Sequence, residues 1–109
     1  MGIEKIKQIV EKYQRGTSAP LGVAFKDLKT GPTVTCHAEE PFPTASAYKI
    51  YVLAELYRKA YSGECNLNDR YPLTADIKSI GSGVLEQLDA GLNLTLKDYA
   101  TLMMIISDN

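Results

Sequence analysis

Apolar residues recur every three to four positions in three stretches of the chain. Between residues 3 and 14 they stand at Ile3, Ile6, Ile9, Val10 and Tyr13. This spacing places them along one face of a helix, so it predicts an amphipathic helix. The same period predicts a second helix from about Ser46 to Ser62 and a third helix that starts at Thr95.

Two shorter apolar stretches separate the first two predicted helices. Residues 21–28 and 33–38 contain Val, Phe and Thr, and a Lys-Thr-Gly-Pro segment at 29–32 joins them. β-Branched and aromatic residues on either side of such a turn predict a β-hairpin. Two prolines within residues 39–43 cannot continue a helix or a ladder, so we expect a connector there.

The region between the second and third predicted helices has no sustained period. Residues 64–83 are rich in Gly, Asn, Asp and Ser, with an extended piece at 70–74, and residues 84–88 predict a short helical turn. The third helix begins with Thr95 and Asp98 in a T-x-x-D pattern. This pattern is similar to a capping box, with Asp in place of the usual Glu.

The composition excludes several classes of protein. The 109 residues correspond to about one domain. Twelve basic and thirteen acidic residues give a net charge of −1, so no basic excess exists to neutralise a nucleic acid. No apolar run approaches the ~18 residues of a membrane span. The first 14 residues lack the apolar core of a signal peptide, which leaves open a parent whose leader has been removed.

Cysteine and histidine usage gives no sign of a metal site or a catalytic triad. Cys36 and Cys65 allow one disulfide at most, and we expect two free or buried thiols. His37, the only histidine, stands in the alternating stretch 33–38, which predicts an exposed position on a strand. No His, Cys, Asp or Glu residues have metal-ligand spacing, so we expect no metal and no cofactor.

Ser46 and Lys49 form an S-x-x-K pattern at the start of the second predicted helix. Residues i and i+3 of a helix have Cβ atoms about 5–6 Å apart, so Lys49 is expected beside the Ser46 hydroxyl. A serine becomes a strong nucleophile when a base takes its proton, and a lysine can be that base only in its neutral form. Burial among Phe42, Ile50 and Leu53 would favour that form. The helix dipole and the backbone N–H of Ser46 would stabilise developing negative charge.

A second pattern, Ser107-Asp108-Asn109, lies at the end of the third predicted helix. A hydroxyl at Ser107 can relay a proton between Lys49 and the leaving nitrogen of a substrate. An amide at Asn109 can hold a substrate carbonyl and contact the lysine. Each pattern alone is common, but S-x-x-K followed by S-D-N belongs to the penicillin-recognising serine enzymes.

The chain therefore resembles the N-terminal part of a class A β-lactamase or a close relative. Residues 42–53 resemble the nucleophile helix of that family, 81–85 a segment of its helical domain, and 94–109 the helix that delivers S-D-N. The resemblance implies an α+β fold of the β-lactamase/transpeptidase type. In that fold residues 1–40 would be the helix and hairpin of the α/β part, and residues 41–109 the nucleophile helix and helical region.

The resemblance also implies a covalent mechanism on a β-lactam or related acyl substrate. Ser46 would attack the lactam carbonyl and become acylated, and Lys49 would help to activate it. Ser107 would carry the proton to the lactam nitrogen, and Asn109 would help to bind substrate and orient Lys49. Whether the lysine or a glutamate acting through water is the base is disputed in class A enzymes. The family implies antibiotic resistance and an extracytoplasmic location.

Other parts of the family's site are expected downstream of Asn109. These are the K-T-G strand, the loop with the deacylating glutamate, the remaining strands and the closing helix. Lys29-Thr30-Gly31 spells K-T-G but precedes Ser46, and a hairpin turn explains it. We therefore expect the chain alone to be inactive. It can be a piece of a longer protein, a partner of a second chain that completes the fold, or a short protein that kept the helical half.

Two other functions stay open on the sequence. One is a penicillin-binding peptidase or esterase, which shares S-x-x-K and differs from a β-lactamase in deacylation. The other is a non-catalytic helical interaction module, which would need no special role for Ser46 or Lys49.

Overall fold

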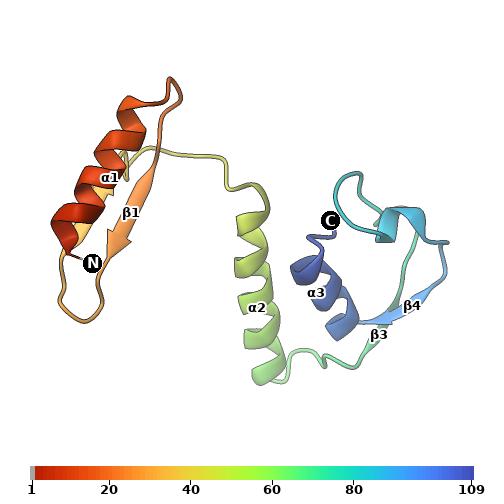
Figure 1. Ribbon diagram of the computed structural model, residues 1–109. Coiled ribbons are helices and arrows are strands. Elements are labelled where there is room, and N and C mark those ends of the chain that lie inside the picture. Colours follow the sequence, from red (N-terminus) through yellow and green to blue (C-terminus); the bar gives the residue numbers. More distant parts are fainter. Residues whose placement is uncertain (1) are drawn as a thin grey trace. The chain divides into compact units, whose positions relative to one another are not determined.

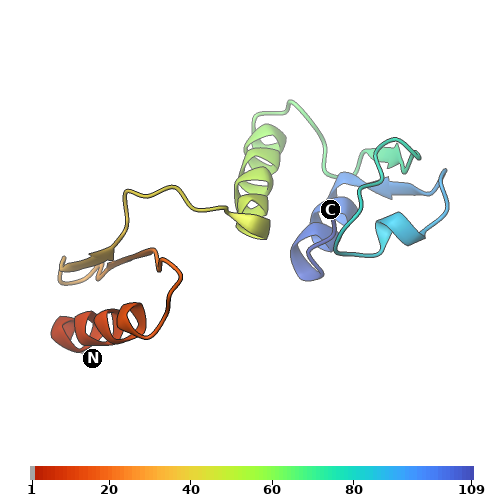
Figure 2. The same ribbon diagram turned by 90° about the horizontal axis from the view of Figure 1, so that it is seen from above.

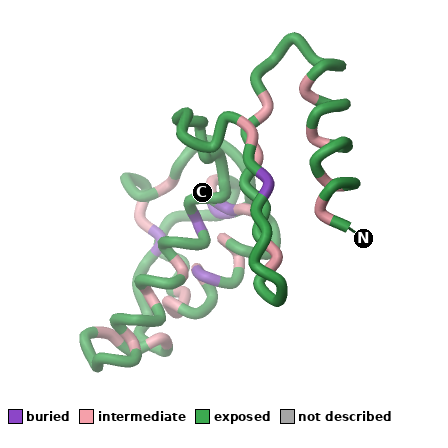
Figure 3. The backbone as a smooth tube through the Cα atoms, turned by 90° about the vertical axis from the view of Figure 1, so that its left-hand side faces the viewer, coloured by how far each residue is buried: buried purple, intermediate pink, exposed green. Residues whose placement is uncertain are grey.

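The computed structural model describes residues 2–109. The chain forms two compact units, Met1–Pro43 and Thr44–Asn109. None of the helices in the described part of the chain is long and apolar enough to cross a membrane. Buried positions are few in both units, and most of the backbone is exposed (Figure 3).

The first unit consists of a helix alongside a two-stranded hairpin (Figures 1 and 2). Helix α1 spans Ile3–Arg15, which confirms the helix predicted from the apolar period. Strands β1 (Val23–Lys26) and β2 (Thr33–Cys36) pair antiparallel, which confirms the hairpin, although both strands are shorter than predicted. The side chain of Val34 in β2 is buried, and it forms the centre of this small unit.

The turn of this hairpin contains the Lys-Thr-Gly triplet. The carboxylate of Asp27 accepts hydrogen bonds from the Lys29 backbone N–H at 2.8 Å and from the Thr30 hydroxyl at 2.6 Å. The Thr30 hydroxyl, followed by the backbone N–H groups of Lys29 and Thr30, lowers the pKa of the Asp27 carboxyl. Gly31 has φ +88°, a left-handed conformation that glycine adopts without steric cost. The triplet therefore has the turn structure expected for it.

The segment after β2 differs from the sequence expectation. His37 was expected on the strand, but it follows β2 in a left-handed conformation with φ 48°. Its Nδ1 atom lies 2.7 Å from Oε1 of Glu40, and both side chains are exposed. Histidine tolerates this backbone conformation better than most residues, so the chain turns there instead of extending the ladder.

The second unit holds two longer helices, α2 (Lys49–Tyr61) and α3 (Leu96–Ile105) (Figure 1). The predicted second helix begins as a 3₁₀ turn, η1 (Ala45–Tyr48), before α2 continues it. The capping box at the start of α3 is confirmed. The Asp98 backbone N–H donates to Thr95 Oγ1 at 3.0 Å, and the Thr95 N–H donates to Asp98 Oδ2 at 2.9 Å.

A small ladder connects these helices. Strand β3 (Arg70–Pro72) falls within the predicted extended piece, and it pairs antiparallel with β4 (Asn93–Thr95), a strand that the sequence did not predict. The predicted helical turn is the 3₁₀ segment η2 (Leu85–Gln87). The core of the unit is formed by Leu73, Leu85 and Ala100, with relative exposures of 1%, 7% and 8%.

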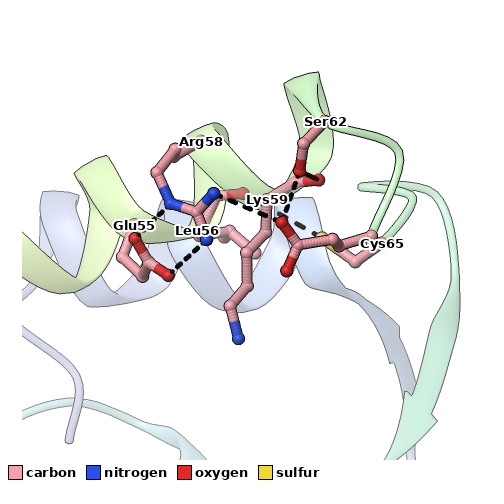
Figure 4. A network of polar contacts seen from close by, with 7 residues as sticks. Glu55, Leu56, Arg58, Lys59, Ser62 and Cys65 are labelled. Atoms are coloured by element: carbon pink, nitrogen blue, oxygen red, sulfur yellow. Dashed lines mark hydrogen bonds and ion pairs between the residues drawn. The ribbon is translucent and has the colours of Figure 1, made fainter.

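Polar contacts hold the C-terminal end of α2 (Figure 4). The Arg58 guanidinium donates to both carboxylate oxygens of Glu55, at 2.7 and 2.9 Å, and lies 3.2 Å from Glu64. The Ser62 hydroxyl lies 2.6 Å from the same Glu64 carboxylate. The Glu55 carboxylate raises the pKa of Arg58, and the Arg58 guanidinium lowers the pKa of Glu55. Cys65, at this end, and Cys36 in β2 are free and half-buried thiols, as expected.

Candidate active site

The start of α2 and the end of α3 bring together the polar residues of the two sequence patterns. Ser46 lies in η1, and Lys49 is the first residue of α2. Ser107 and Asn109 follow the last turn of α3. The Ser107 and Ser46 hydroxyl oxygens are 2.8 Å apart, although 61 positions separate these residues in the chain.

Lys49 is the buried centre of this cluster, with a relative exposure of 3%. Its Nζ atom donates to three oxygens: the backbone carbonyl of Ser107 at 2.5 Å, the Ser107 hydroxyl at 3.2 Å and Oδ1 of Asn109 at 2.8 Å. A lysine ammonium has three N–H donors, so each donor has an acceptor. This pairing offsets the cost of burying the amine.

The path between Lys49 and Ser46 differs from the one that helical spacing predicted. Across residues 2–109, no hydrogen bond joins Lys49 to Ser46, and the Ser107 hydroxyl lies between them. The lysine reaches the end of α3 because three acceptors meet there, whereas Ser46 alone offers one. Lys49 Nζ donates to Ser107 Oγ, and Ser107 Oγ donates to Ser46 Oγ, so two hydrogen bonds connect the three side chains in that order.

The cavity beside Lys49 is lined by residues other than Phe42, Ile50 and Leu53, the three that were expected to bury it. Ile50, one of the three, is 60% exposed. The cavity is mostly apolar, has a volume of about 350 Å³ and is lined mainly by residues from α2, α3 and η2. Val52, Leu85 and Met103 are among its lining residues. The lysine is therefore buried where α2 meets α3.

Backbone strain is concentrated at this cluster. Three non-glycine residues within 2–109 have positive φ, and two of them are Ala45, with φ 43°, and Ser107, with φ 57°. Ala45 immediately precedes Ser46. Such residues cost on the order of 1–3 kcal/mol each, and they cluster at active sites and ligand clamps. The Ser107 hydroxyl thus belongs to a strained residue, and the Ser46 hydroxyl belongs to the residue directly after one.

Asn109 is anchored on a loop that the sequence singled out at residues 81–85. Its backbone N–H donates to the Ser82 carbonyl at 3.1 Å, and its Nδ2 atom donates to the Ile80 carbonyl at 3.2 Å. The neighbouring Asp108 is buried, with a relative exposure of 4%. Sequence reasoning gave Asp108 no role of its own, because a polar residue after a helix is ordinarily solvated.

The exposure of the cluster is asymmetric. Ser46 and Asn109 are exposed and Ser107 is half-buried, whereas Lys49 and Asp108 are buried. A reagent can therefore reach the Ser46 hydroxyl while the groups behind it stay shielded from water. The part of the chain described by the structure contains no group of three or more His, Cys, Asp and Glu that could hold a metal ion.

The profile of the beta-lactamase enzyme family matches residues 3–109. The chain belongs to the beta-lactamase enzyme family. Its fold is similar to that of a beta-lactamase from Sphaerobacter thermophilus DSM 20745, with 33% identity and a TM-score of 0.88 over the whole of this chain. No match was found among curated proteins.

Two structures of PBP-A show the same fold at 22% identity over 98% of this chain. One is PBP-A itself, with a TM-score of 0.87, and the other is a mutant solved as an acyl-enzyme complex with penicillin G, with a TM-score of 0.88. The chain spans about 40% of the length of these solved relatives. The expected α+β fold of the β-lactamase type is thus confirmed. The division at residues 40 and 41 into regions of one domain stays a prediction.

Proposed function

We propose that the protein carrying this chain is a β-lactamase-type serine hydrolase, and that Ser46 is its nucleophile. The observation that carries the proposal is the hydrogen-bonded chain from Ser46 through Ser107 to Lys49. It places the Ser107 hydroxyl, to which the buried Lys49 donates, within hydrogen-bond reach of the exposed Ser46 hydroxyl, so that Ser107 can take the proton as Ser46 attacks a carbonyl. Membership of the beta-lactamase enzyme family supports the same chemistry.

The Ser107 hydroxyl is the proposed proton carrier in this reaction. As Ser46 Oγ bonds to the lactam carbonyl carbon, Ser107 gives its own proton to the lactam nitrogen and takes the Ser46 proton in its place, across the 2.8 Å between the two hydroxyl oxygens. The carbon–nitrogen bond then breaks with its nitrogen already protonated. Lys49 Nζ donates to Ser107 Oγ at 3.2 Å and stabilises the partial negative charge on that oxygen during the exchange. No proton is gained or lost overall in forming the acyl-enzyme.

Asn109 is the proposed substrate-binding residue. Its Oδ1 atom accepts from Lys49, and one N–H of Nδ2 donates to the Ile80 carbonyl. A carboxamide nitrogen has two N–H groups, so the second is available to a carbonyl of the substrate. The exposure of Asn109 allows a ligand to reach it.

The remaining parts of the site are proposed to lie in polypeptide outside this chain. Relatives of known structure are about two and a half times as long, since the chain spans 40% of the Sphaerobacter enzyme. A deacylating glutamate and a K-T-G strand would be supplied there, by the same polypeptide or by a second chain. We propose that residues 1–109 alone are inactive for this reason.

A fluorescent penicillin with mass spectrometry tests the proposal on the complete polypeptide. We expect a covalent adduct on Ser46 that is lost in Ser46→Ala and retained in Ser18→Ala, which removes an exposed hydroxyl from the other unit. An adduct on another residue, or none in the folded protein, would contradict the assignment of Ser46. No adduct would also favour a non-catalytic interaction module.

A penicillin-binding peptidase is the second candidate, and the fold similarity to PBP-A favours it. The two candidates differ in how long the acyl-enzyme survives. A β-lactamase hydrolyses its adduct and turns over, whereas a peptidase of this kind keeps it. The lifetime of the adduct after excess penicillin is removed therefore separates them.

A further inference from the structure

A groove of about 670 Å³ lies between one flank of α1 and strand β2 in the first unit. Residues 32–36 line its strand side, and no residue of β1 lines it, although β1 pairs with β2 along the other edge. The buried Val34 and the exposed Thr33 and Thr35 all belong to the lining. The groove therefore follows the edge of β2 with which no strand within residues 2–109 pairs.

The backbone of this edge offers hydrogen-bonding groups to a further strand. At the turn of the hairpin, the Asp27 N–H donates to the Pro32 carbonyl at 3.0 Å. Because hydrogen-bonded and non-hydrogen-bonded pairs alternate along an antiparallel ladder, Val34 bonds to β1, whereas the N–H and C=O groups of Thr33 and Thr35 point away from it. An edge of this kind is a template for another strand.

Charged side chains of alternating sign form the helical wall of the groove. They follow one another at spacings of three and four residues on one flank of α1, and they are Glu4, Lys7, Glu11 and Arg15. The series begins with an acid and ends with a base. Two copies of the helix placed antiparallel therefore set Glu4 opposite Arg15 and Lys7 opposite Glu11, with opposite charges in every pair. This flank is complementary to itself.

The strand and the charged series have the same midpoint. Figure 1 shows α1 and β1 running in opposite directions, so β2, which is antiparallel to β1, runs in the direction of α1. Gln14 Oε1 lies 3.8 Å from Cys36 Sγ, which places the end of α1 beside the end of β2. Two strand residues span about 6.6 Å, the rise of about four to five helical residues. Val34 is therefore level with residues 9–10 of α1, the middle of the charged series.

We propose that this face binds a second copy of the chain in a twofold-symmetric dimer. The two β2 strands pair antiparallel about Val34, so that Thr33 of each copy exchanges N–H···O=C bonds with Thr35 of the other. A twofold contact requires a patch that is complementary to itself, which is the property of this edge and of the charged flank beside it. The dimer is independent of the acyl-transfer chemistry proposed above, because its residues belong to the first unit.

The two α1 helices lie antiparallel across the same axis and form the Glu4–Arg15 and Lys7–Glu11 ion pairs, each of them twice. Within one chain Arg15 lies 3.8 Å from Glu11, and their side chains are 82% and 49% exposed, so a carboxylate of the second copy can reach the guanidinium. The contact is polar and narrow, so we expect a dimer with a dissociation constant in the micromolar range.

Sedimentation velocity on the complete polypeptide tests the dimer. A concentration series up to about 100 µM covers dissociation constants in the micromolar range. Lys7→Glu places like charges opposite Glu11 at two symmetry-related positions, so we expect the dissociation constant to rise about 10-fold or more. Lys5→Glu makes the same charge change at an exposed lysine outside the groove, and it should leave the constant unchanged.

A charge exchange separates direct pairing from a general effect of charge. Glu11→Lys alone should also weaken the dimer, because its introduced lysine faces Lys7 of the second copy. When the Glu11→Lys and Lys7→Glu proteins are mixed, the introduced lysine faces the introduced glutamate, and the native Lys7 faces the native Glu11. We therefore expect the mixture to sediment as a dimer at concentrations where each variant alone is a monomer.

A substitution in β2 tests the pairing of the strands. Thr35→Pro removes an N–H that points to the free edge, a position at which an edge strand tolerates proline. We expect it to abolish the dimer. Thr35→Ala keeps the N–H group and should dimerise as the unmodified protein does. If Thr35→Pro does not fold, the charge variants decide alone.

The proposal is overturned if the complete polypeptide stays monomeric throughout the series, the result expected where a downstream strand of the same polypeptide covers β2. A dimer that Lys7→Glu does not weaken would overturn it equally, as would a mixture of the two charge variants that stays monomeric. None of these results depends on acylation of Ser46, so the outcome is separate from that of the proposed function.

Discussion

The Nζ atom of Lys49 lies 2.8 Å from Oδ1 of Asn109, and this contact ties the first residue of α2 to the segment that follows α3. The same nitrogen donates to the Ser107 carbonyl and hydroxyl. We call these three acceptor oxygens the ammonium cradle. Because they converge on one nitrogen atom, replacing Lys49 by a residue with a differently shaped cation tests whether this geometry is needed.

Lys49→Arg is expected to abolish acylation of Ser46, although the positive charge is kept. A planar guanidinium cannot place its donors on three acceptors that converge on one point. Leaving a buried acceptor unpaired costs about 1–3 kcal/mol, so the thermal midpoint of the variant should fall as well. Lys59→Arg, at an exposed lysine of the same helix, is the matched control and should behave as the unmodified protein. Near-normal acylation in Lys49→Arg would contradict the role given to the cradle.

Ser107→Ala is expected to slow acylation about 100-fold or more, since it removes the hydroxyl that separates Ser46 from Lys49. Stopped-flow labelling with a fluorescent penicillin measures the rate. Ser62→Ala, which removes a hydroxyl at the far end of α2, is the control. An unchanged rate in Ser107→Ala would exclude Ser107 as proton carrier.

Ser107→Gly tests the strained backbone at the same position. Glycine adopts a φ of 57° without the steric cost of a Cβ atom, a cost of about 1–2 kcal/mol for other residues. The greater freedom of glycine in the unfolded chain offsets about 0.5–1 kcal/mol of that gain. We therefore expect Ser107→Gly to be at least as stable as Ser107→Ala in urea unfolding. A clearly less stable glycine variant would show that the left-handed conformation carries no strain.

Thr95→Ala is expected to destabilise the second unit by about 0.5–2 kcal/mol, because it removes the side-chain cap of α3. The helix loses the acceptor for the Asp98 backbone N–H. The polar cluster around Lys49 lies at the other end of α3, so it should be disturbed only if the unfolding of the first turn extends that far. Chemical denaturation measures the loss. Thr101→Ala, which removes a hydroxyl bonded to a carbonyl within the same helix, is the comparison and should cost less.

Stability is expected to fall in acid in part through Asp98. The hydrogen bond with the Thr95 side chain is the largest cause, followed by the one from the Thr95 backbone N–H. Together they lower the pKa of the Asp98 carboxyl below the ordinary value of 3.8. A depressed folded-state pKa adds stability that is fully present above the unfolded value and is lost as pH falls through the folded one. Asp98→Asn should therefore lose less stability between neutral pH and about pH 2 than the unmodified protein. Equal acid sensitivity would contradict this contribution.

Most of the secondary structure follows from local sequence. The period of apolar residues predicted α1 and α3, and the T-x-x-D pattern predicted the cap at Thr95, because helices and caps depend on neighbours within one turn. Strand β4 was missed. Its three residues pair with β3 more than twenty positions away, and nothing within so short a segment signals that partner.

The structure brings the residues of the two patterns, Ser46, Lys49, Ser107 and Asn109, to one place. The contact between Lys49 and Asn109 was predicted and is confirmed, whereas the link from Lys49 to Ser46 through Ser107 was not predicted. Helical spacing predicted that Lys49 lies beside the Ser46 hydroxyl. In the structure its Nζ atom donates instead to oxygens of Ser107 and Asn109 at the end of α3. The burial of Asp108 depends on the N–H groups of a distant loop, so no local pattern reveals it.

The separation of 61 positions between the two serine hydroxyls has a consequence for the order of events during synthesis. Ser46 emerges from the ribosome long before its partner does, and a growing chain orders its earlier segments first. Until Ser107 is made and α3 has docked, Ser46 lacks the hydrogen-bond partner that the proposed function requires. Under that proposal, we expect a copy unfolded at α3 to react with a penicillin no faster than an ordinary alcohol does.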